Sequence, residues 1–190
     1  VRRGTRGPLK IIGAQGTASS RITIRNEAGG LLTINGTAGK FILNFNACRY
    51  VNAVFNQSMT TEVIDGKSIS YGLLLTVASA STIPTCWIKT SGTTSFIKIS
   101  NFKIDGKRTT FTSGGGGVGI QTYDIELPKT KVVGGVTVAQ WTESVEIANF
   151  IITSTKGEGV YGGINFYTAA GARNRNMSIH DGVIQSTGRE

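Results

Sequence analysis

The segment FIKISNFKIDG, residues 96–106, carries a pattern that the chain repeats. The pattern recurs as SVEIANFIITS at residues 144–154 and as NMSIHDGVIQS at 176–186, and an earlier stretch, FILNFNACRYV at 41–51, fits the same spacing. Each copy reads as apolar, any, apolar, then two residues, then apolar, any, apolar. Internal repetition of one short unit is typical of a repeat architecture.

The repeat predicts two short strands that meet at a corner. Alternating polarity places the apolar side chains on one face of each strand and the polar side chains on the other. The break of phase falls at Asn101, Asn149 and Asp181 in three copies and at Ala47 in the fourth. Asn and Asp tolerate the left-handed backbone that a corner requires, so we expect the chain to turn there. The predicted inward positions are Leu43, Phe45, Cys48, Tyr50, Ile97, Ile99, Phe102, Ile104, Val145, Ile147, Phe150, Ile152, Met177, Ile179, Gly182 and Ile184.

Glycine-led apolar strands form a second repeated element. They read YGLLLTV from Tyr71, GVGIQTY from Gly117 and GGINFYT from Gly162, each after a polar stretch of different length. We find no convincing apolar period of a helix with a capping residue, although the connection at residues 56–70 leaves room for one short helix. The sequence therefore predicts an all-β fold, a β-solenoid of about five coils with variable loops.

Length and composition predict the number of domains, and the net charge indicates which kinds of binding partner to expect. The 190 residues are 39% hydrophobic and show no abrupt shift in composition, so we predict one domain over residues 1–190. Lys and Arg number 20 against 11 Asp and Glu, and the formal net charge of +9 favours anionic partners. The basic residues are scattered without a recognisable nucleic-acid motif, so specific nucleic-acid binding is not expected. No apolar run is long enough for a membrane span.

The repeats resemble those of the pectate-lyase-like superfamily. ISNFKIDG and IANFIITS, each with Asn at the corner, are similar to its coil repeats. Residues 6–36, RGPLKIIGAQGTASSRITIRNEAGGLLTING, are similar to the opening coils of its secreted bacterial members. The resemblance covers nearly the whole chain and implies a right-handed parallel β-helix that is secreted or on the cell surface. It is specific for the fold alone, because this architecture serves lyases, hydrolases, epimerases, phage tailspikes and adhesins.

The resemblance leaves two functions open. The first is an extracellular module that binds or acts on an acidic polysaccharide or a cell-surface glycan, in the manner of a polysaccharide lyase or a glycoside hydrolase. The alternative is a non-catalytic structural or adhesive β-solenoid of a cell-surface or fibre protein. Aligned basic and aromatic residues on a strand-lined face would favour the first function, and a featureless surface of Ser, Thr and Asn would favour the second.

The predicted substrate-binding residues are Asn165, Tyr167, Arg173, Arg175 and His180. Lyases of this superfamily neutralise the carboxylate of a sugar acid and remove the adjacent proton, which suits a cluster of basic and polar side chains. The competing interpretation is that these are solvated turn residues of a basic surface. His180 beside Asp181 reads either as a proton shuttle or as an exposed strand histidine. One histidine and scattered carboxylates predict no metal site, and the sequence assigns neither a cofactor nor a catalytic residue.

The two cysteines and the last repeat give further expectations. Cys48 falls on an inward position, so we favour free thiols in the core over a disulfide with Cys86. The last repeat is followed by residues 186–190 without its glycine-led partner strand, so we expect the winding to continue. Residues 179–184 would then pair with further strands of the same chain or, as the alternative, with the end of another copy.

Overall fold

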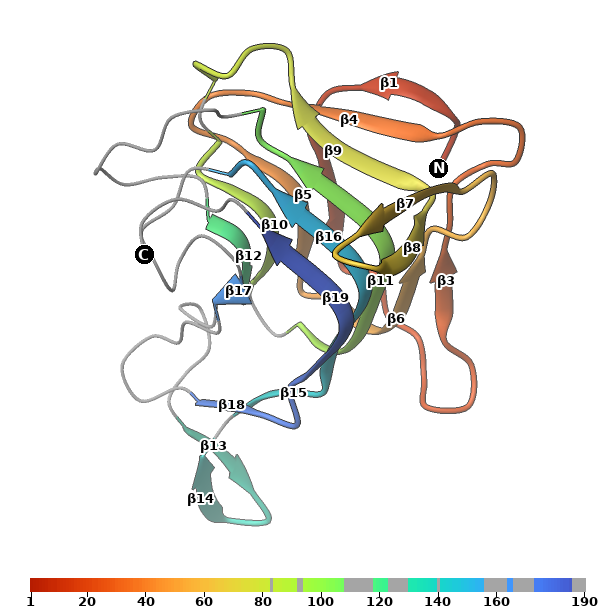
Figure 1. The fold of residues 1–190 in the computed structure, drawn as a ribbon. Coiled ribbons are helices and arrows are strands. Elements are labelled where there is room, and N and C mark those ends of the chain that lie inside the picture. Colours follow the sequence, from red (N-terminus) through yellow and green to blue (C-terminus); the bar gives the residue numbers. More distant parts are fainter. Residues whose placement is uncertain are drawn as a thin grey trace.

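The protein consists of β-strands throughout the part of the chain that is described. The computed structural model describes residues 1–82, 84–91, 94–107, 118–122, 130–139, 141–155, 164–165 and 173–185. Every regular element in these ranges is a strand, so the predicted all-β class is confirmed (Figure 1). Within the same ranges, no helix is long and apolar enough to cross a membrane.

Two parallel sheets form the body. The eight-stranded sheet contains β1 (Gly4–Arg6), β3 (Ile22–Ile24), β4 (Leu32–Gly36), β6 (Arg49–Val54), β9 (Leu73–Val77), β11 (Ser95–Asp105), β16 (Val145–Thr153) and β19 (Ser178–Gln185). The five-stranded sheet contains β2 (Leu9–Ile12), β5 (Phe41–Asn46), β10 (Cys86–Ser91), β12 (Val118–Thr122) and β17 (Ile164–Asn165). All pairs within both sheets are parallel. The chain visits the two sheets in alternation, so each sheet grows by addition of strands along the sequence.

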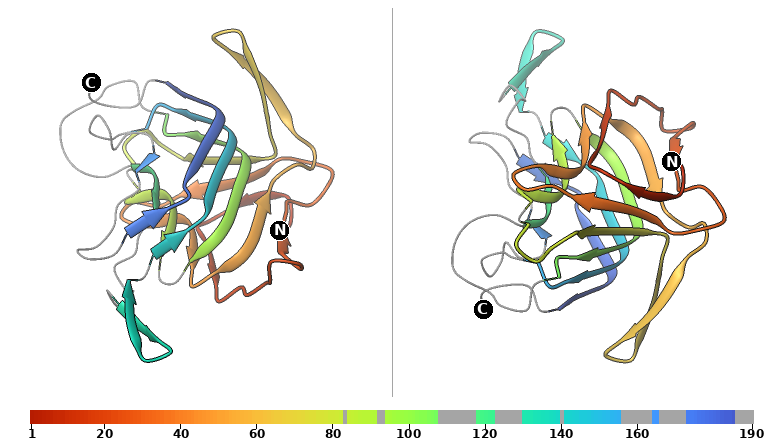
Figure 2. Two further views of the ribbon diagram at one scale, coloured as in Figure 1. Left: turned by 90° about the horizontal axis from the view of Figure 1, so that it is seen from below. Right: turned by 90° about the horizontal axis from the view of Figure 1, so that it is seen from above.

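Three small pairs of strands accompany these sheets. They are the antiparallel hairpins β7 (Thr60–Ile64) with β8 (Lys67–Tyr71) and β13 (Thr130–Val133) with β14 (Val136–Ala139), and the parallel pair β15 (Trp141–Glu143) with β18 (Arg173–Arg175). Figure 2 shows that the two hairpins project from opposite sides of the body. They are insertions between strands of the sheets and leave the parallel pairing of the body intact.

Equivalent side chains of successive repeats stack on one another, as predicted. Ile99 pairs in register with Ile147, and Ile147 pairs with Ile179. Ile99 and Ile147 are fully buried in the apolar core between the sheets, whereas Ile179 is 43% exposed. Ile184 is 45% exposed on the same strand, because β16 is the one neighbour of β19 among the described strands. The further strand expected beside β19 stays a prediction.

Left-handed backbone marks the predicted corners. The φ angle is 62° at Asn101, 50° at Asn149 and 55° at Asp181, where β11, β16 and β19 bend. Ala47 also has a positive φ, 52°, but it turns the chain between β5 and β6, which is a different corner. Asn and Asp are among the residues that adopt this backbone most readily, which explains their recurrence in the repeat.

The predicted copy at residues 41–51 is in the wrong register. Leu43 and Phe45 lie in β5 of the five-stranded sheet. The true counterparts of the β11 core residues are Val51, Ala53, Leu73 and Leu75. Cys48 is buried as predicted, but Leu73 and not Cys48 matches Phe102. The error arises because strands of both sheets alternate in polarity, so spacing alone does not reveal which sheet a strand joins.

The short helix that residues 56–70 had room for does not form, because hairpin β7–β8 occupies this connection. Its turn residues Asp65 and Gly66 have φ angles of 51° and 78°, and Asp-Gly favours the tight two-residue turn of a hairpin. Ile69 and Tyr71 of the hairpin pack with Ile151 against the outside of the eight-stranded sheet. The hairpin is inserted between β6 and β9. These two strands pair with the first and second halves of β11, so the hairpin interrupts this copy of the repeat at its corner.

The two cysteines are free thiols, as predicted. Both Cys48 and Cys86 are fully buried. The Cys48 thiol lies 3.4 Å from the carbonyl oxygens of Ile11 and Asn46, and burial raises its pKa. A buried thiol with a raised pKa is a poor nucleophile, so Cys48 acts as a small core residue.

Candidate functional site

A row of polar residues occupies paired backbone positions across the five-stranded sheet, and of its described side chains Lys10 is exposed whereas Asn44 and Lys89 are buried. The polar row consists, strand by strand, of Lys10, Asn44, Lys89, Gln121 and Asn165, which pair in register. Parallel strands lie about 4.8 Å apart, so the row is a continuous line of polar positions across all five strands. Apolar residues that alternate with it, such as Leu43 and Ile88, are buried in the core.

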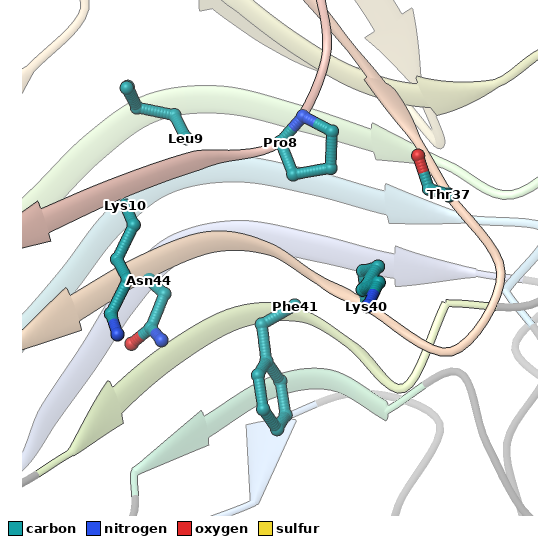
Figure 3. A pocket seen from close by; sticks show the side chains of 7 residues that line it. All are labelled: Pro8, Leu9, Lys10, Thr37, Lys40, Phe41 and Asn44. Carbon is teal, nitrogen blue, oxygen red and sulfur yellow. The ribbon is translucent and has the colours of Figure 1, made fainter.

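A hollow lies at the start of the polar row. Its volume is about 430 Å³, within the range of small-ligand sites. Figure 3 shows the side chains of Lys10 and Asn44 side by side, with the ring of Phe41 beyond them on the same face. The lining residues are Pro8, Leu9, Lys10, Thr37, Lys40, Phe41 and Asn44. Strands β2 and β5 and the turn before β5 therefore build this site.

The charge of the hollow is positive. Lys10 and Lys40 line it, and no acidic residue is among its lining residues. Lys89, the next position of the polar row, has its ammonium nitrogen 4.0 Å from the ring centroid of Phe41. This side chain is only 9% exposed, so a cation–π contact holds its charge beside the hollow. The arrangement can attract a carboxylate or sulfate group and offers an aromatic ring and the Asn44 amide beside it.

The predicted substrate-binding residues lie on three different sheets at the level of the backbone. Asn165 is in β17, where it ends the polar row. Arg173 and Arg175 are in β18, which pairs with β15, and His180 is in β19 of the eight-stranded sheet. Tyr167 lies outside the described residues. Of the members of this set that the structure describes, only Asn165 shares a sheet with the hollow.

His180 belongs to a chain of charges on the outside of the eight-stranded sheet. Its Nδ1 lies 2.7 Å from a carboxylate oxygen of Asp181, and its Nε2 lies 3.3 Å from Glu146. The hydrogen bond to Asp181, and next that to Glu146, raise the pKa of His180. Glu146 also accepts a hydrogen bond from Lys98 at 2.6 Å, and this bond is the largest cause of its lowered pKa. Both ring nitrogens thus face carboxylates, which suits a charged imidazolium that bridges them more than a shuttle that releases its proton.

Sequence reasoning missed the residues of the hollow. Lys10, Asn44 and Lys89 each follow an apolar residue of a short strand, and the alternation was available as a signal that they lie on the face opposite the core. Their common row depends on the register between strands that are far apart in the chain. Phe41 gave no signal of its own, because an aromatic residue at the start of a strand reads as core.

Among the residues that the structure describes, no group of three or more His, Cys, Asp and Glu side chains is placed to hold a metal ion.

Comparisons with known proteins give no relative. The sequence matches no protein-family model and no curated protein, and no solved structure matches the chain.

Proposed function

We propose that the chain is an extracellular right-handed parallel β-helix module that binds an acidic polysaccharide. Three features support the fold assignment: exclusively parallel pairing in both large sheets, their alternation along the chain, and left-handed corners in register. Connections between parallel strands of one sheet are right-handed in nearly all proteins, which supports the hand. The extracellular location rests on the resemblance of the repeats to secreted members of the pectate-lyase-like superfamily.

The polar row and its hollow carry the functional proposal. A polymer that lies across the hollow would meet the exposed side chains of Lys10 and Lys40, with the Asn44 amide among the lining residues. Lysine attracts anionic groups, and Asn and Gln amides both donate and accept hydrogen bonds with sugar hydroxyls. The ring of Phe41 adds an apolar surface for the carbon-bound hydrogens of a sugar. Basic residues beside an aromatic ring in one hollow support a glycan-binding module over a featureless solenoid.

Direct binding tests the proposal. We expect oligogalacturonate or an alginate oligomer to bind in calorimetric titrations, with affinity that falls as salt rises, and a neutral oligosaccharide of equal length to bind far less. The Lys10→Gln, Lys40→Gln double variant should weaken binding about tenfold. The matched control is Lys67→Gln, Lys107→Gln, which removes the same charge from exposed lysines outside the hollow. Equal loss in both double variants would mean that only net charge matters and would contradict the assigned face.

Incubation of the protein with the same oligosaccharides tests for polysaccharide lyase activity. Cleavage by elimination creates a carbon–carbon double bond in the product, which absorbs ultraviolet light. We propose that Lys10 and Lys40 would neutralise the sugar carboxylate in such a reaction, because they are the cations that line the hollow. Growth of the product absorbance, lost in the Lys10→Gln, Lys40→Gln variant, would make the module an enzyme, and binding without product would make it a glycan-binding unit.

A structural or adhesive solenoid is the second candidate function. The exposed side chains of Ile179 and Ile184 on β19 favour it, because an apolar strand edge is a template for pairing with another copy. Sedimentation velocity separates the two candidates. Assembly that depends on concentration and is abolished by Ile184→Lys, without glycan binding, would select the structural function.

A further inference from the structure

Two arginines and two stacked aromatic rings form a cluster at the starts of β3, β6 and β11. The rings of Tyr50 and Phe96 stack with centroids 4.5 Å apart and planes 8° apart. The Arg21 guanidinium lies 5.8 Å from the Tyr50 centroid. The Arg49 guanidinium lies 5.3 Å from Tyr50 and 5.4 Å from Phe96, so it stands beside the stacked pair and not over the outer face of either ring. We call these four residues the corner cluster.

The backbone of this corner does not require aromatic residues. Tyr50 and Phe96 have φ angles of 52° and 55°, a conformation that is unusual for bulky side chains. Ser144 and Asn176 stand directly before the later repeats with φ angles of 55° and 54°. A small or amide side chain therefore suffices for the turn. The two aromatic rings add strain to the corner, and strained positions of this kind cluster at functional sites.

Arg21 is held in place with donors to spare. Its Nη1 donates hydrogen bonds to the Asn52 side-chain oxygen at 3.0 Å and to the Phe96 carbonyl oxygen at 3.1 Å. A guanidinium has five N–H donors, so those on Nε and Nη2 remain for a ligand. A group that is fixed before binding loses little conformational entropy when the ligand arrives. Arg21 is therefore preorganised to receive an acceptor.

The two guanidinium groups lie near the same Tyr50 ring, and neither has an acidic partner among the described residues. Both lie within 6 Å of the centroid of the Tyr50 ring. In the part of the chain that the structure describes, neither Arg21 nor Arg49 forms a salt bridge, and both side chains are exposed. Arg21 and Arg49 carry like charges, which repel one another. An anion between them would turn this repulsion into two charge-assisted sets of hydrogen bonds.

We infer that the corner cluster is a binding site for an oxyanion group, a sulfate or a carboxylate, which Arg21 and Arg49 grip from two sides. Tyr50 and Phe96 act as positioning residues, because Arg49 lies beside both rings, while Arg21 lies near the Tyr50 ring and donates to the Phe96 carbonyl oxygen. None of the four residues lines the hollow on the five-stranded sheet. The inference is therefore independent of the proposed glycan-binding face, and either can fail while the other stands.

Arginine side-chain NMR tests this site with inorganic sulfate as the probe. The Nε–Hε signals of the ¹⁵N-labelled protein are followed as sulfate replaces chloride at constant ionic strength. We expect saturable shifts of the Arg21 and Arg49 signals and no saturation at Arg25, an exposed arginine outside the cluster. Shifts that stay linear in sulfate, or that are equal at all arginines, would overturn the site.

Variants separate ligand contacts from positioning. Arg49→Gln should weaken sulfate binding about tenfold, and Arg25→Gln should leave it unchanged. Tyr50→Asn places at this corner the residue type that Asn176 supplies in a later repeat, so the fold should tolerate it. The same variant should lower sulfate affinity severalfold while Arg49 keeps its charge. Unchanged affinity in both Arg49→Gln and Tyr50→Asn would rule out the proposed arrangement.

Two further titrations, followed by the Arg49 signal, show whether the bound oxyanion belongs to a glycan or is a free ion. A sulfated oligosaccharide and an oligogalacturonate present the two oxyanions on a polymer. Tighter binding of one of them than of inorganic sulfate would identify the corner cluster as a glycan contact and name its anionic group. Binding of inorganic sulfate that neither oligosaccharide exceeds would identify a site for a free anion.

Discussion

The side-chain amide of Asn149 donates a hydrogen bond to the side-chain oxygen of Asn101 at 2.6 Å, which joins the corners of two neighbouring strands. The same amide nitrogen donates to the carbonyl oxygen of Ser70 in hairpin β7–β8 at 2.9 Å. Asn149→Ala removes both bonds and leaves a left-handed backbone on alanine, so we expect the free energy of unfolding to fall by about 2 kcal/mol. Urea denaturation measures this change. Asn56→Ala, at an exposed position, should change it by less than about 0.5 kcal/mol.

The inward register of the repeat predicts that Ile147→Asp prevents folding. Ile147 is fully buried in the apolar core, and an unpaired carboxylate there costs several kcal/mol, comparable with the whole stability of a domain. The control is Ile12→Asp, because Ile12 is 64% exposed. Circular dichroism and thermal melting should show the Ile147 variant unfolded and the Ile12 variant near the parent. A native-like melt of the Ile147 variant would disprove the register.

Gly182 is predicted to be intolerant of any side chain while Phe150 is present. A Cβ atom at Gly182 would lie 2.2 Å from the Phe150 ring, which also stacks on Phe102 with centroids 5.7 Å apart. Gly182→Ala should therefore destabilise the protein by about 1–3 kcal/mol, as overpacking does. Gly7→Ala should be neutral, since nothing lies within 4 Å of a Cβ atom there. In a double-mutant cycle, Phe150→Leu should relieve part of the Gly182→Ala penalty, and strict additivity would refute the contact.

The pH dependence of stability should carry the signature of His180. Its folded-state pKa is raised above the usual 6.5 by hydrogen bonds to Asp181 and Glu146. The contribution to stability is therefore fully present below pH 6.5 and is lost as the pH rises through the folded-state pKa. An NMR titration of the imidazole ring measures this pKa directly. Asp181→Asn should bring it back toward 6.5, and no change in this variant would contradict the assigned cause.

Hairpin β7–β8 should loosen when Glu62 loses its charge. Both carboxylate oxygens of Glu62 accept hydrogen bonds from Lys103 at 2.8 Å, and Tyr71 donates a third. Burial alone would raise the pKa of Glu62, but these bonds outweigh it and leave the pKa below its usual value. Their contribution is present above the unfolded-state pKa and is lost as the pH falls through the lowered one. Glu62→Gln should increase hydrogen exchange in β7 and β8 at neutral pH, whereas Glu27→Gln, at an exposed position, should not.

The strands and corners of the repeats could be predicted from the sequence, because each depends on a few residues that are adjacent in the chain. The alternation around Ile99 and Ile147 is a property of a few adjacent residues, and both side chains face the core as predicted. Asn101 and Asn149 supply the corner because their side chains suit a left-handed backbone. The hairpin at residues 60–71 was missed because its turn, Asp65 and Gly66, lies between strands of mixed polarity that show no clear period of two.

The predicted substrate-binding residues stay a prediction, and residues that join from separate strands are hard to find from local sequence. The predicted set drew on residues that are near one another in sequence, from Asn165 to His180, yet their strands belong to three sheets. The hollow instead joins Lys10 of β2 with Phe41 and Asn44 of β5. Such a grouping depends on the register between strands that are distant in the chain, which local sequence patterns do not predict.

By itself, the sequence determined that the chain is all-β, which residues of the later repeats face the core, and that the protein is cationic. The net charge is a sum over all residues, and the strands follow from short-range patterns, because strand alternation has a period of only two residues. Only the tertiary structure decided that Lys10, Asn44 and Lys89 share one row and that Arg21 and Arg49 lie near the same Tyr50 ring. The physical reason is that pairing between distant strands is selected by packing of the whole core, and the corners then carry the outward side chains to positions that no local pattern specifies.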